Sequence, residues 1–260
     1  MPVPPAEKAA ELFDLSGAVA LVTGASGGFG RRFVRVLAAN GGRVAAAARA
    51  PERLDGFLAE VEQTGGIAAA FRLDVTDRAS IVCAFDSVEA KWGRVTLLIN
   101  NAGIAHSGRA AEVTPETWRN VMDVDLDGAF FVMQEFARRL IAAETPGIIV
   151  NIASVIGIRA EKGAVAYTAA KAGLIQLTRG LALEWARYGI RVNALAPGWF
   201  PTAINRDYLA SEAGDALRKK IPMRRFGEEG DLDGALLLLA SNAGAFMTGA
   251  TIVVDGGEEI

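Results

Sequence analysis

The sequence predicts an α/β protein in which one doubly wound parallel sheet of about seven strands carries helices on both faces. Short, almost continuously apolar segments alternate along the chain with longer segments of helical period. Strands that are apolar on both faces are typical of a parallel sheet covered by helices on each side. Because no linker or internal repeat interrupts this alternation, we expect residues 1–260 to form a single domain.

The expected strands are short apolar runs, and helical segments such as RRFVRVLAANG and ASIVCAFDSVEAKWG separate the first six of them. The predicted strands are Val19–Thr23, Arg43–Ala48, Ala68–Leu73, Val95–Asn100, Ile148–Ile152, Arg191–Ala194 and Thr251–Val254. Two helices carry end signals. Gly41 and Gly42 suit a C-terminal cap, and Thr114 can cap a helix whose first turn begins with Pro115.

Two segments fall outside this alternation. Residues 1–15 contain early prolines and scattered charges, which predicts an N-terminal arm that leads into the first strand. The stretch from Trp199 to about Gly230 is the longest without strand character. It follows the carboxyl end of a strand, where ligands bind in sheets of this type, so we expect it to cover a substrate.

The composition limits the classes of protein to be considered. Hydrophobic residues make up 51% of the chain and charged residues 22%, which excludes a disordered protein. The net charge is −3, with 27 basic and 30 acidic residues well mixed, so neither nucleic acid nor an anionic membrane is indicated as a partner. No apolar run approaches the ~20 residues of a membrane helix. No secretory signal is recognised and no metal site is predicted, and we expect a cytoplasmic protein.

Cys83 is the only cysteine, which excludes an internal disulfide and suits a reducing compartment. It lies in ASIVCAF, within an expected helix. We interpret it as a packing residue on the buried face of that helix rather than as a reactive thiol.

A glycine-rich turn, TGASGGFG, follows the first predicted strand. It departs from the G-x-G-x-x-G fingerprint because its wide gap comes first, but the same physics applies. Gly24 can take a conformation closed to other residues, Gly28 lets the chain approach a phosphate, and Gly30 lets the helix lie close to the strand. The helix N-terminus then offers free amides to a pyrophosphate. The alternative is a tight strand–helix turn without a ligand.

The stretch YTAAK places Tyr167 and Lys171 on one face of a helix. By itself this pattern suits an ordinary amphipathic helix. Ser154, thirteen positions before Tyr167, ends the predicted strand IIVNIAS and favours a catalytic interpretation. A positive charge ~4 Å away at an effective dielectric of ~20 is worth about 4 kcal/mol, enough to bring a phenol from ~10 to near ~7 before desolvation raises its pKa again.

Taken together, TGASGGFG, NNAG at 100–103, Ser154 followed by YTAAK, and PG at 197–198 resemble the short-chain dehydrogenase/reductase family. The resemblance runs from LSGAVALVTG to GATIVVDGG. Within the family, the sequence is most similar to 3-oxoacyl reductases and related carbonyl reductases. Each motif is weak alone, but their order and spacing are highly specific.

The resemblance implies hydride transfer between a nicotinamide and a carbonyl or carbinol carbon. Tyr167 would supply or remove the oxygen-bound proton, Ser154 would orient that oxygen, and Lys171 would hold the nicotinamide ribose and stabilise the tyrosinate. The implied cofactor contacts are Gly24, Ser26, Gly28, Phe29, Gly30, Arg49, Asp74, Val75, Asn100, Ala102, Gly103, Tyr167, Lys171, Pro197, Gly198 and Thr202.

NADP is favoured over NAD as the cofactor. Ala48 stands where the NAD-selective aspartate of the family would be, and Arg49 follows it. An arginine there accommodates the 2′-phosphate of NADP. Arg53 is a second candidate or only a surface charge. Asp74 matches the family position that bonds the adenine amino group, and alternatively it caps the next turn.

One position departs from the family pattern. The family usually has asparagine in a setting like VNLDGAF, whereas this chain reads VDLDGAF, with Asp125 in that place. An ionised Asp125 near Lys171 would offset the lysine's field and raise the pKa of Tyr167. We expect an active enzyme with a shifted pH profile, and we include Asp125 among the catalytic candidates.

On the substrate side, Trp199 and Phe200 form either an apolar substrate wall or part of the core. His106 is expected in an exposed loop rather than in catalysis. The many charges of INRDYLASEAGDALRKKIPMRRFG suit a solvated helix face, or alternatively the recognition of an anionic carrier. A small carbonyl or alcohol is the expected substrate. The family commonly forms tetramers, and the apolar helix Asp125–Ile141 and the last strand suit a homotetramer. The alternative function is a regulator that senses NADP without turnover.

Overall fold

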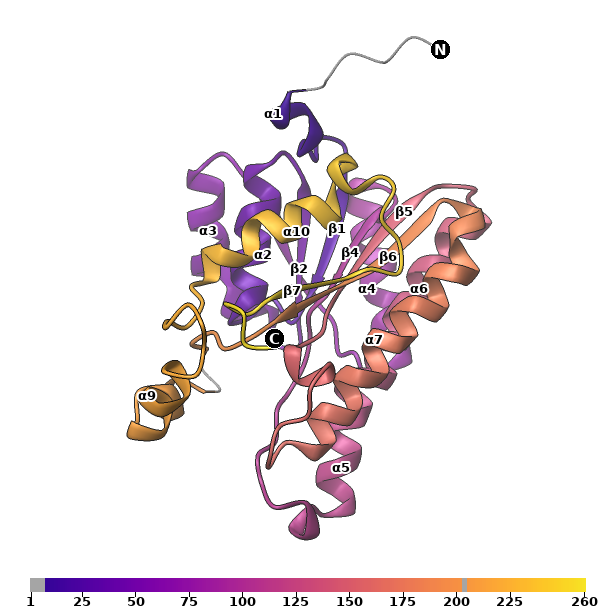
Figure 1. Cartoon of the computed structure of the whole chain (residues 1–260). Coiled ribbons are helices and arrows are strands. Elements are labelled where there is room, and N and C mark those ends of the chain that lie inside the picture. Colours follow the sequence, from indigo (N-terminus) through magenta and orange to yellow (C-terminus); the bar gives the residue numbers. More distant parts are fainter. Residues whose placement is uncertain (1–7, 203–204) are drawn as a thin grey trace, which may run out of the picture.

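The computed structural model describes residues 8–202 and 205–260 and is organised around one seven-stranded parallel sheet (Figure 1). The strands run in the order β3-β2-β1-β4-β5-β6-β7, and every neighbouring pair is parallel. They are β1 Val19–Thr23, β2 Arg43–Ala48, β3 Ile67–Arg72, β4 Leu97–Asn100, β5 Gly147–Ile152, β6 Ile190–Pro197 and β7 Thr251–Val254. The predicted fold class and all seven predicted strands are confirmed, with small shifts at some strand ends.

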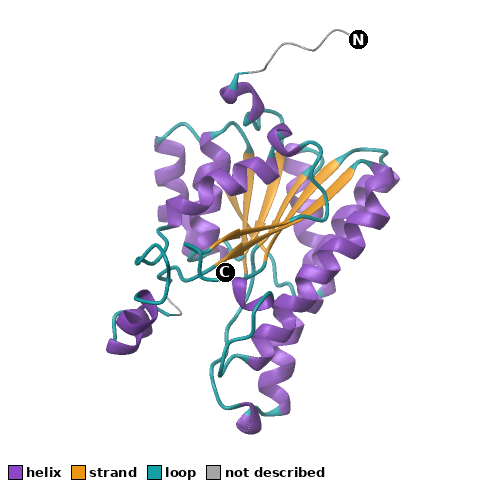
Figure 2. Ribbon diagram, in the orientation of Figure 1, coloured by secondary structure: helices purple, strands orange, loops and turns teal. Residues whose placement is uncertain are grey.

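The helices cover both faces of this sheet (Figure 2). They are α1 Ala9–Leu12, α2 Phe29–Ala39, α3 Asp55–Gln63, α4 Arg78–Trp92, α5 Pro115–Met122, α6 Ala129–Ala142, α7 Val165–Trp185, α8 Arg206–Leu209, α9 Glu212–Arg218 and α10 Asp233–Ala240. The predicted end signals are confirmed. The side chain of Thr114 accepts from the amide of Thr117, Pro115 opens α5, and Gly41 follows α2 with φ +92°. Of the predicted arm, residues 1–7 lie outside the described residues.

Each face of the sheet has its own core. Helices α2, α3 and α10 lie on one side in Figure 1, where Val22 packs with Phe33 and Leu236. Helices α4, α6 and α7 lie on the other side, where Leu21 packs with Phe136. Neighbouring residues of β1 point into opposite cores, which explains why the strand is apolar throughout.

The carboxyl ends of the strands define the functional edge of the molecule. The strand order reverses at β1, since β2 pairs with one edge of it and β4 with the other. Ligands bind at such a switch point in open α/β sheets. Figure 1 shows α5, the first turns of α7 and α9 extending beyond this edge, with the C-terminus near its middle.

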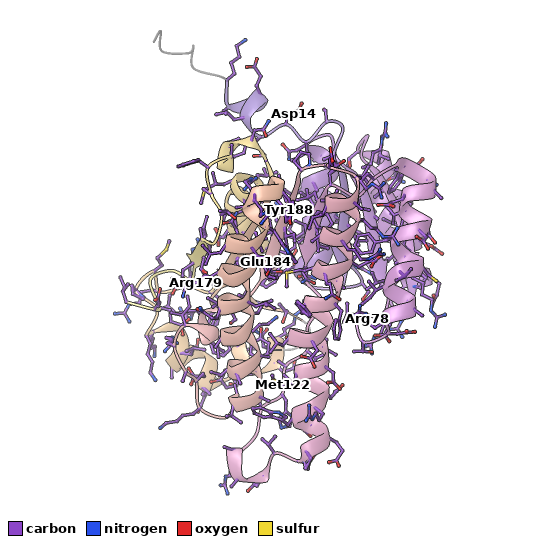
Figure 3. All side chains as sticks on the ribbon, turned by 90° about the vertical axis from the view of Figure 1, so that its right-hand side faces the viewer. Asp14, Arg78, Met122, Arg179, Glu184 and Tyr188 are labelled. Carbon is purple, nitrogen blue, oxygen red and sulfur yellow. The ribbon has the colours of Figure 1, made fainter. Side chains whose placement is uncertain are left out.

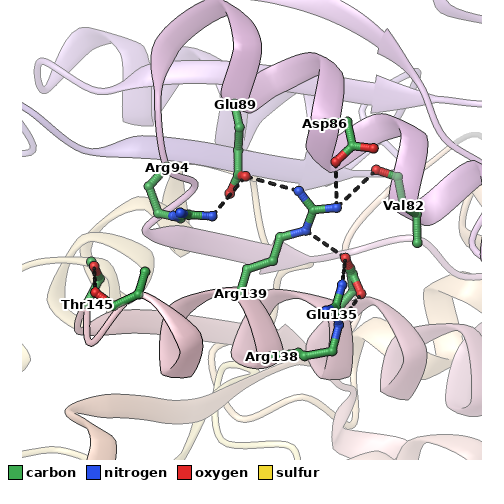
Figure 4. A network of polar contacts seen from close by, with 9 residues as sticks. Val82, Asp86, Glu89, Arg94, Glu135, Arg138, Arg139 and Thr145 are labelled. Carbon is green, nitrogen blue, oxygen red and sulfur yellow. Dashed lines mark hydrogen bonds and ion pairs between the residues drawn. The ribbon is translucent and has the colours of Figure 1, made fainter.

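A network of charges joins α4 to α6 (Figure 4). The Arg139 guanidinium contacts Glu135 at 2.6 Å, Asp86 at 2.7 Å and Glu89 at 3.0 Å. Burial lowers the pKa of Arg139, but these carboxylates outweigh it and hold the pKa above its ordinary value. The network fixes the two helices against each other.

The interpretation of Cys83 as a buried packing residue is wrong, because its side chain is exposed. The buried face of α4 consists instead of Ile81, Ala84, Phe85 and Val88. These positions follow the helical spacing of three and four residues, and Cys83 falls off that stripe.

Candidate active site

The glycine-rich turn lies between β1 and α2 and faces the loop after β4. Gly24 has φ +66°, and a Cβ there would lie 2.8 Å from the Cα of Ala102. A Cβ at Gly30 would lie 2.4 Å from the carbonyl oxygen of Gly24. The predicted reasons for these two glycines, conformation and close packing, are therefore confirmed. Gly28, with φ +50°, is the N-cap residue of α2, and as a glycine it places no side chain over the first amides of that helix.

Thr23 and Asn101 join these two loops, and sequence reasoning missed both. The amides of Asn101 and Ala102 each donate to Thr23 Oγ1 at 2.9 Å. Asn101 Nδ2 donates in return to the carbonyl oxygen of Thr23 at 2.9 Å. A threonine that ends a strand directly before a glycine turn was the available signal for this contact.

Asn100 steadies the sheet from inside. Its buried Nδ2 donates to the carbonyl oxygen of Ala129 at 2.9 Å and to Asn151 Oδ1 at 3.2 Å. Asn151 in turn donates to Thr178 Oγ1 of α7 at 2.9 Å. The side chain of Asn100 therefore connects β4 with β5 and the start of α6.

Ser154, Tyr167 and Lys171 lie together at the carboxyl edge. Ser154 follows β5, is 8% exposed and accepts from the amide of Ile156 at 3.3 Å. Tyr167 and Lys171 lie on the first turns of α7, and the ammonium lies 5.5 Å from the centre of the phenol ring. Lys171 is 3% exposed and donates to the carbonyl oxygen of Ile152 at 3.1 Å. The predicted grouping of the three side chains is present.

Asp125 reaches the same place from a π-helical turn, Asp123–Gly128, between α5 and α6. The side chain is fully buried, with Oδ2 3.1 Å from Lys171 Nζ in an ion pair. Its Oδ1 accepts from the amide of Ile104 at 2.8 Å, in the loop after β4. π-helical turns within helices occur frequently at functional sites. The sequence predicted a regular helix here and missed this turn.

Gly103 gives the ion pair its space. A Cβ at this position would lie 2.8 Å from Asp125 Oδ2 and 3.4 Å from Lys171 Nζ. Any side chain at 103 would therefore push on the buried carboxylate. Gly103 has a packing role here in addition to its predicted place beside the cofactor.

The pKa of Tyr167 is raised above its ordinary value, so the lowering expected from Lys171 is present but does not prevail over the expected rises from burial and from Asp125. Burial of the phenol is the largest cause. Lys171 and the hydroxyl of Ser154 lower the pKa, whereas Asp125 raises it again. For Lys171, burial lowers the pKa, but Asp125 and Tyr167 outweigh burial and raise it. Lys171 therefore stays charged, but the negative charge of Asp125 offsets part of its lowering effect on the pKa of Tyr167.

At the other end of the edge, two exposed arginines flank buried Ala48. Arg49 follows β2, and Arg72 lies directly beside Ala48 in the β2–β3 register. Paired residues of parallel strands point to the same face, so Arg72 extends past the small Ala48. Sequence reasoning missed Arg72; its signal is a charge at the end of an otherwise apolar strand. Arg53 is exposed on the 3₁₀ turn Pro51–Leu54.

Asp74 takes part in a local turn, as one of the two interpretations predicted. Its Oδ1 accepts from the amide of Thr76 at 3.0 Å and from the Thr76 hydroxyl at 2.8 Å. Burial raises the pKa of Asp74, but these hydrogen bonds and the charges of Arg49 and Arg72 lower it overall. Val75 is buried, and its carbonyl oxygen lies 2.9 Å from where a Cβ of Gly128 would be.

The segment after β6 approaches the glycine-rich turn. Pro197 ends the strand, and the amide of Gly198 donates to the carbonyl oxygen of Val254 at 2.9 Å. Thr202 is held by the side chain of Asn205, which accepts from its amide at 2.7 Å. A Cβ at Gly28 would lie 4.0 Å from Thr202 Cγ2, so the two predicted cofactor segments face each other.

Three residues of uncertain role on the substrate side are now placed. Phe200 is 3% exposed and packs edge-on against Phe29 at 5.4 Å, so it belongs to the core. Trp199 is half-buried and donates through Nε1 to Glu258 Oε1 at 2.7 Å. His106 is half-buried rather than exposed as expected. Within the described chain, no cluster of three or more His, Cys, Asp or Glu residues suits a metal ion.

The glycine-rich turn at a topological switch point and the adjacent serine, tyrosine and lysine define a dinucleotide-binding oxidoreductase. The comparisons agree with this class. Residues 24–259 match the family profile described as enoyl-(acyl carrier protein) reductase. The chain belongs to the short-chain dehydrogenase/reductase family. Its relatives in this family are named as dehydrogenases and reductases that act on CH–OH or C=O groups.

Relatives in this family are similar over nearly their whole length. Gluconate 5-dehydrogenase of Gluconobacter oxydans is 39% identical over 248 residues, covering 95% of this chain and 96% of the relative. A 3-oxoacyl-[acyl-carrier-protein] reductase of Thermotoga maritima is 37% identical over 243 residues, covering 94% and 98%. A crystal structure of gluconate 5-dehydrogenase from Burkholderia cenocepacia, in complex with NADP and tartrate, has a TM-score of 0.92 at 37% identity, covering 96% and 98%.

Proposed function

We propose that this protein interconverts a ketone and a secondary alcohol with NADP(H), using Tyr167 as the general acid and base. One observation carries the proposal. The charged Lys171 lies 5.5 Å from the Tyr167 ring, and Ser154 lies beside it, at the sheet edge that the glycine-rich turn also borders. A phenol held between a hydroxyl and a buried ammonium suits proton transfer to and from a substrate oxygen.

The residues present fit a nicotinamide dinucleotide. A Cβ at Gly27 would meet open space, and the N-cap residue of α2, Gly28, has no side chain that could occupy the first amides of the helix. They would hold the pyrophosphate, with Arg49 and Arg72 near the adenosine ribose. When bound, the nicotinamide supplies or accepts the hydride. NADP fits better than NAD because Ala48 leaves no carboxylate to bond a free 2′-hydroxyl or to repel a 2′-phosphate.

The protein's own residues handle the proton and the charge. Tyr167 donates its proton to the carbonyl oxygen during reduction and removes it from the alcohol during oxidation, while Ser154 orients that oxygen. Lys171 stabilises the tyrosinate, and Asp125 holds Lys171 in place at 3.1 Å. Asp125 thus fixes the position of Lys171, but it also opposes the lowering of the Tyr167 pKa by Lys171.

Two substrate classes are supported by the relatives: polyhydroxylated acids or alcohols, as for gluconate 5-dehydrogenase and D-threitol dehydrogenase, and 3-oxoacyl thioesters. Trp199 and the loop after Ser154 would border the substrate. The segment from Trp199 to about Gly230, of which 203–204 are outside the described residues, would cover it.

The proposed assembly is a homotetramer. Figure 3 shows Arg179 and Glu184 on the outer side of α7. Leu183, on the same helix, is 86% exposed. Phe246, just before β7, is fully exposed as well. Large apolar side chains at these places suit burial against a second copy.

No helix of the described chain is both long and apolar enough to span a bilayer. The proposed location is the cytoplasm.

The test is cofactor turnover by the purified full-length protein. NADP and NAD are offered with gluconate, D-threitol and galactitol, and NADPH and NADH with acetoacetyl-CoA. Removing the general acid typically costs ~10²–10⁴-fold in rate, so Tyr167→Phe should lose turnover and keep its NADPH affinity. Tight NADPH binding without turnover on the whole panel, unaffected by Tyr167→Phe, would favour the regulator instead.

A further inference from the structure

Glu258, near the C-terminus, is a buried carboxylate that joins two separate parts of the substrate side. Its side chain is 4% exposed. Oε1 accepts from Trp199 Nε1 at 2.7 Å and forms an ion pair with the guanidinium of Arg159. Trp199 follows the predicted nicotinamide segment, and Arg159 lies in the loop between Ser154 and Tyr167. Sequence reasoning gave neither Glu258 nor Arg159 a role.

The tail that carries Glu258 is fixed rather than loose. The side chain of Asp255 accepts from the amides of Gly257 at 2.8 Å and Glu259 at 2.7 Å. The tail also lies directly on the segment after β6, because a Cβ at Gly198 would be 2.6 Å from Asp255 Cβ and 3.3 Å from Glu258 Oε2. The absence of a side chain at Gly198 lets the carboxylate approach.

Burying the Glu258 carboxylate at this position costs free energy. Within residues 8–202 and 205–260, neither Glu258 Oε2 nor Arg159 Nε has a hydrogen-bond partner, although both atoms are buried. Burial raises the pKa of Glu258, Trp199 and Arg159 lower it, and Asp255 raises it, for a net increase. A buried charge with one unpaired oxygen is weak evidence for stability, and polar groups of this kind concentrate at functional sites.

Both partners of Glu258 keep surface to offer a ligand. The Arg159 side chain is 36% exposed, and it forms a second, longer ion pair with Glu161 at 3.7 Å. Trp199 is half-buried, and its ring lies 6.0 Å from that of Tyr208 on α8. The hydrogen bond and the ion pair to a single oxygen fix the orientation of both exposed groups.

We infer that Glu258 is a positioning residue that holds Trp199 and Arg159 as one wall of the substrate site. The inference rests on the proposed function, because the wall is that of the same active site. Glu258 does not touch the reacting atoms. It sets where the indole and the guanidinium meet the substrate.

The first test needs no turnover. The emission of Trp199 is obtained as the difference between the wild type and Trp199→Phe. As the pH falls through the acidic range, Glu258 takes up a proton, and the Trp199 emission should change. The charged groups that face this contact are Arg159, Asp255 and, through Arg159, Glu161. Glu258→Gln, compared with its own Trp199→Phe double variant, should abolish the change.

The control is Asp231→Asn, which breaks the exposed ion pair with Arg225. It should leave the titration of Trp199 as in the wild type. Emission that does not vary with pH in the wild type, or that varies equally in Glu258→Gln, would overturn the inference.

The second test is kinetic and uses whichever of gluconate, D-threitol, galactitol and acetoacetyl-CoA the wild type turns over best. Losing one hydrogen bond or ion pair of this kind is worth about tenfold. Glu258→Gln and Arg159→Met should each raise KM about tenfold, with kcat and the Kd for NADPH unchanged. The double variant should lose no more than either single variant. A parallel fall in kcat and NADPH affinity would show a merely structural role. If the wild type turns over nothing, the proposed function fails, and the fluorescence titration still tests whether Glu258 holds Trp199.

Discussion

Asp125 Oδ2 lies 3.1 Å from Lys171 Nζ, in a pair whose side chains are 0% and 4% exposed. The carboxylate comes from the π-helical turn before α6 and the ammonium from α7. The pair fixes the charge that faces Tyr167, and its negative partner opposes that charge. The pKa of Tyr167 therefore depends on Asp125, a residue that lies far from Tyr167 in the sequence and outside the YTAAK motif.

Asp125→Asn should lower the pKa of Tyr167. Burial and Asp125 both raise this pKa, and removing the carboxylate leaves the opposing effect of Lys171 stronger. Alcohol oxidation requires the tyrosinate, so the limb of the kcat/KM profile that rises with pH should move to lower pH. The profile is measured against Asp127→Asn, an exposed aspartate two positions away. Coincident profiles for all three proteins would refute the electrostatic role of Asp125.

Lys171→Met should destabilise the fold by about 3 kcal/mol, because it leaves Asp125 buried without its partner. The double variant Asp125→Asn/Lys171→Met should recover part of that loss. Urea unfolding of the four proteins measures the difference in free energy of unfolding. Equal instability of the single and double variants would mean that the pair is not coupled.

Arg49→Ala and Arg72→Ala should weaken NADPH binding by about tenfold each, while NADH binding stays the same. Each removes a charge-assisted contact to the 2′-phosphate, typically ~1.5–3 kcal/mol. Arg43→Ala, at the opposite end of β2, is the matched control. Titration of cofactor fluorescence gives the dissociation constants. In either variant, a loss shared equally by NADPH and NADH would place that arginine outside phosphate recognition.

Arg139→Met should lower the free energy of unfolding by about 3 kcal/mol, because Arg139 is 12% exposed and its partners Glu135 and Glu89 are 7% and 17% exposed. Arg138→Met removes a guanidinium that is 65% exposed from the same Glu135, and should cost less than about 1 kcal/mol. The contribution of the network falls as acid protonates Glu135. Burial raises the pKa of Glu135, and the hydrogen bonds from Arg138 and Arg139 outweigh burial and lower it. The decrease in the free energy of unfolding that Arg139→Met causes should therefore become smaller as the pH falls through the lowered pKa of Glu135.

The sequence by itself determined the fold class, the strands and most of the candidate catalytic groups. Apolar runs predict strands such as Val19–Thr23 because a strand covered on both faces buries every side chain. Gly24 and Gly30 were predictable because their backbone requirements are local. Tyr167 and Lys171 share a face simply because they are one helical turn apart.

Only the tertiary structure decided the contacts between distant segments. The approach of Asp125 to Lys171 requires a π-helical turn and the open space at Gly103. Glu258 meets Arg159 across 99 positions and Trp199 across 59. Periodicity reports whether a side chain is buried, but it does not report which charge it is buried against. That partner is set by strand order and helix packing. For Tyr167, burial is the largest cause of the raised pKa, and the carboxylate of Asp125 adds to it against the lowering by Lys171.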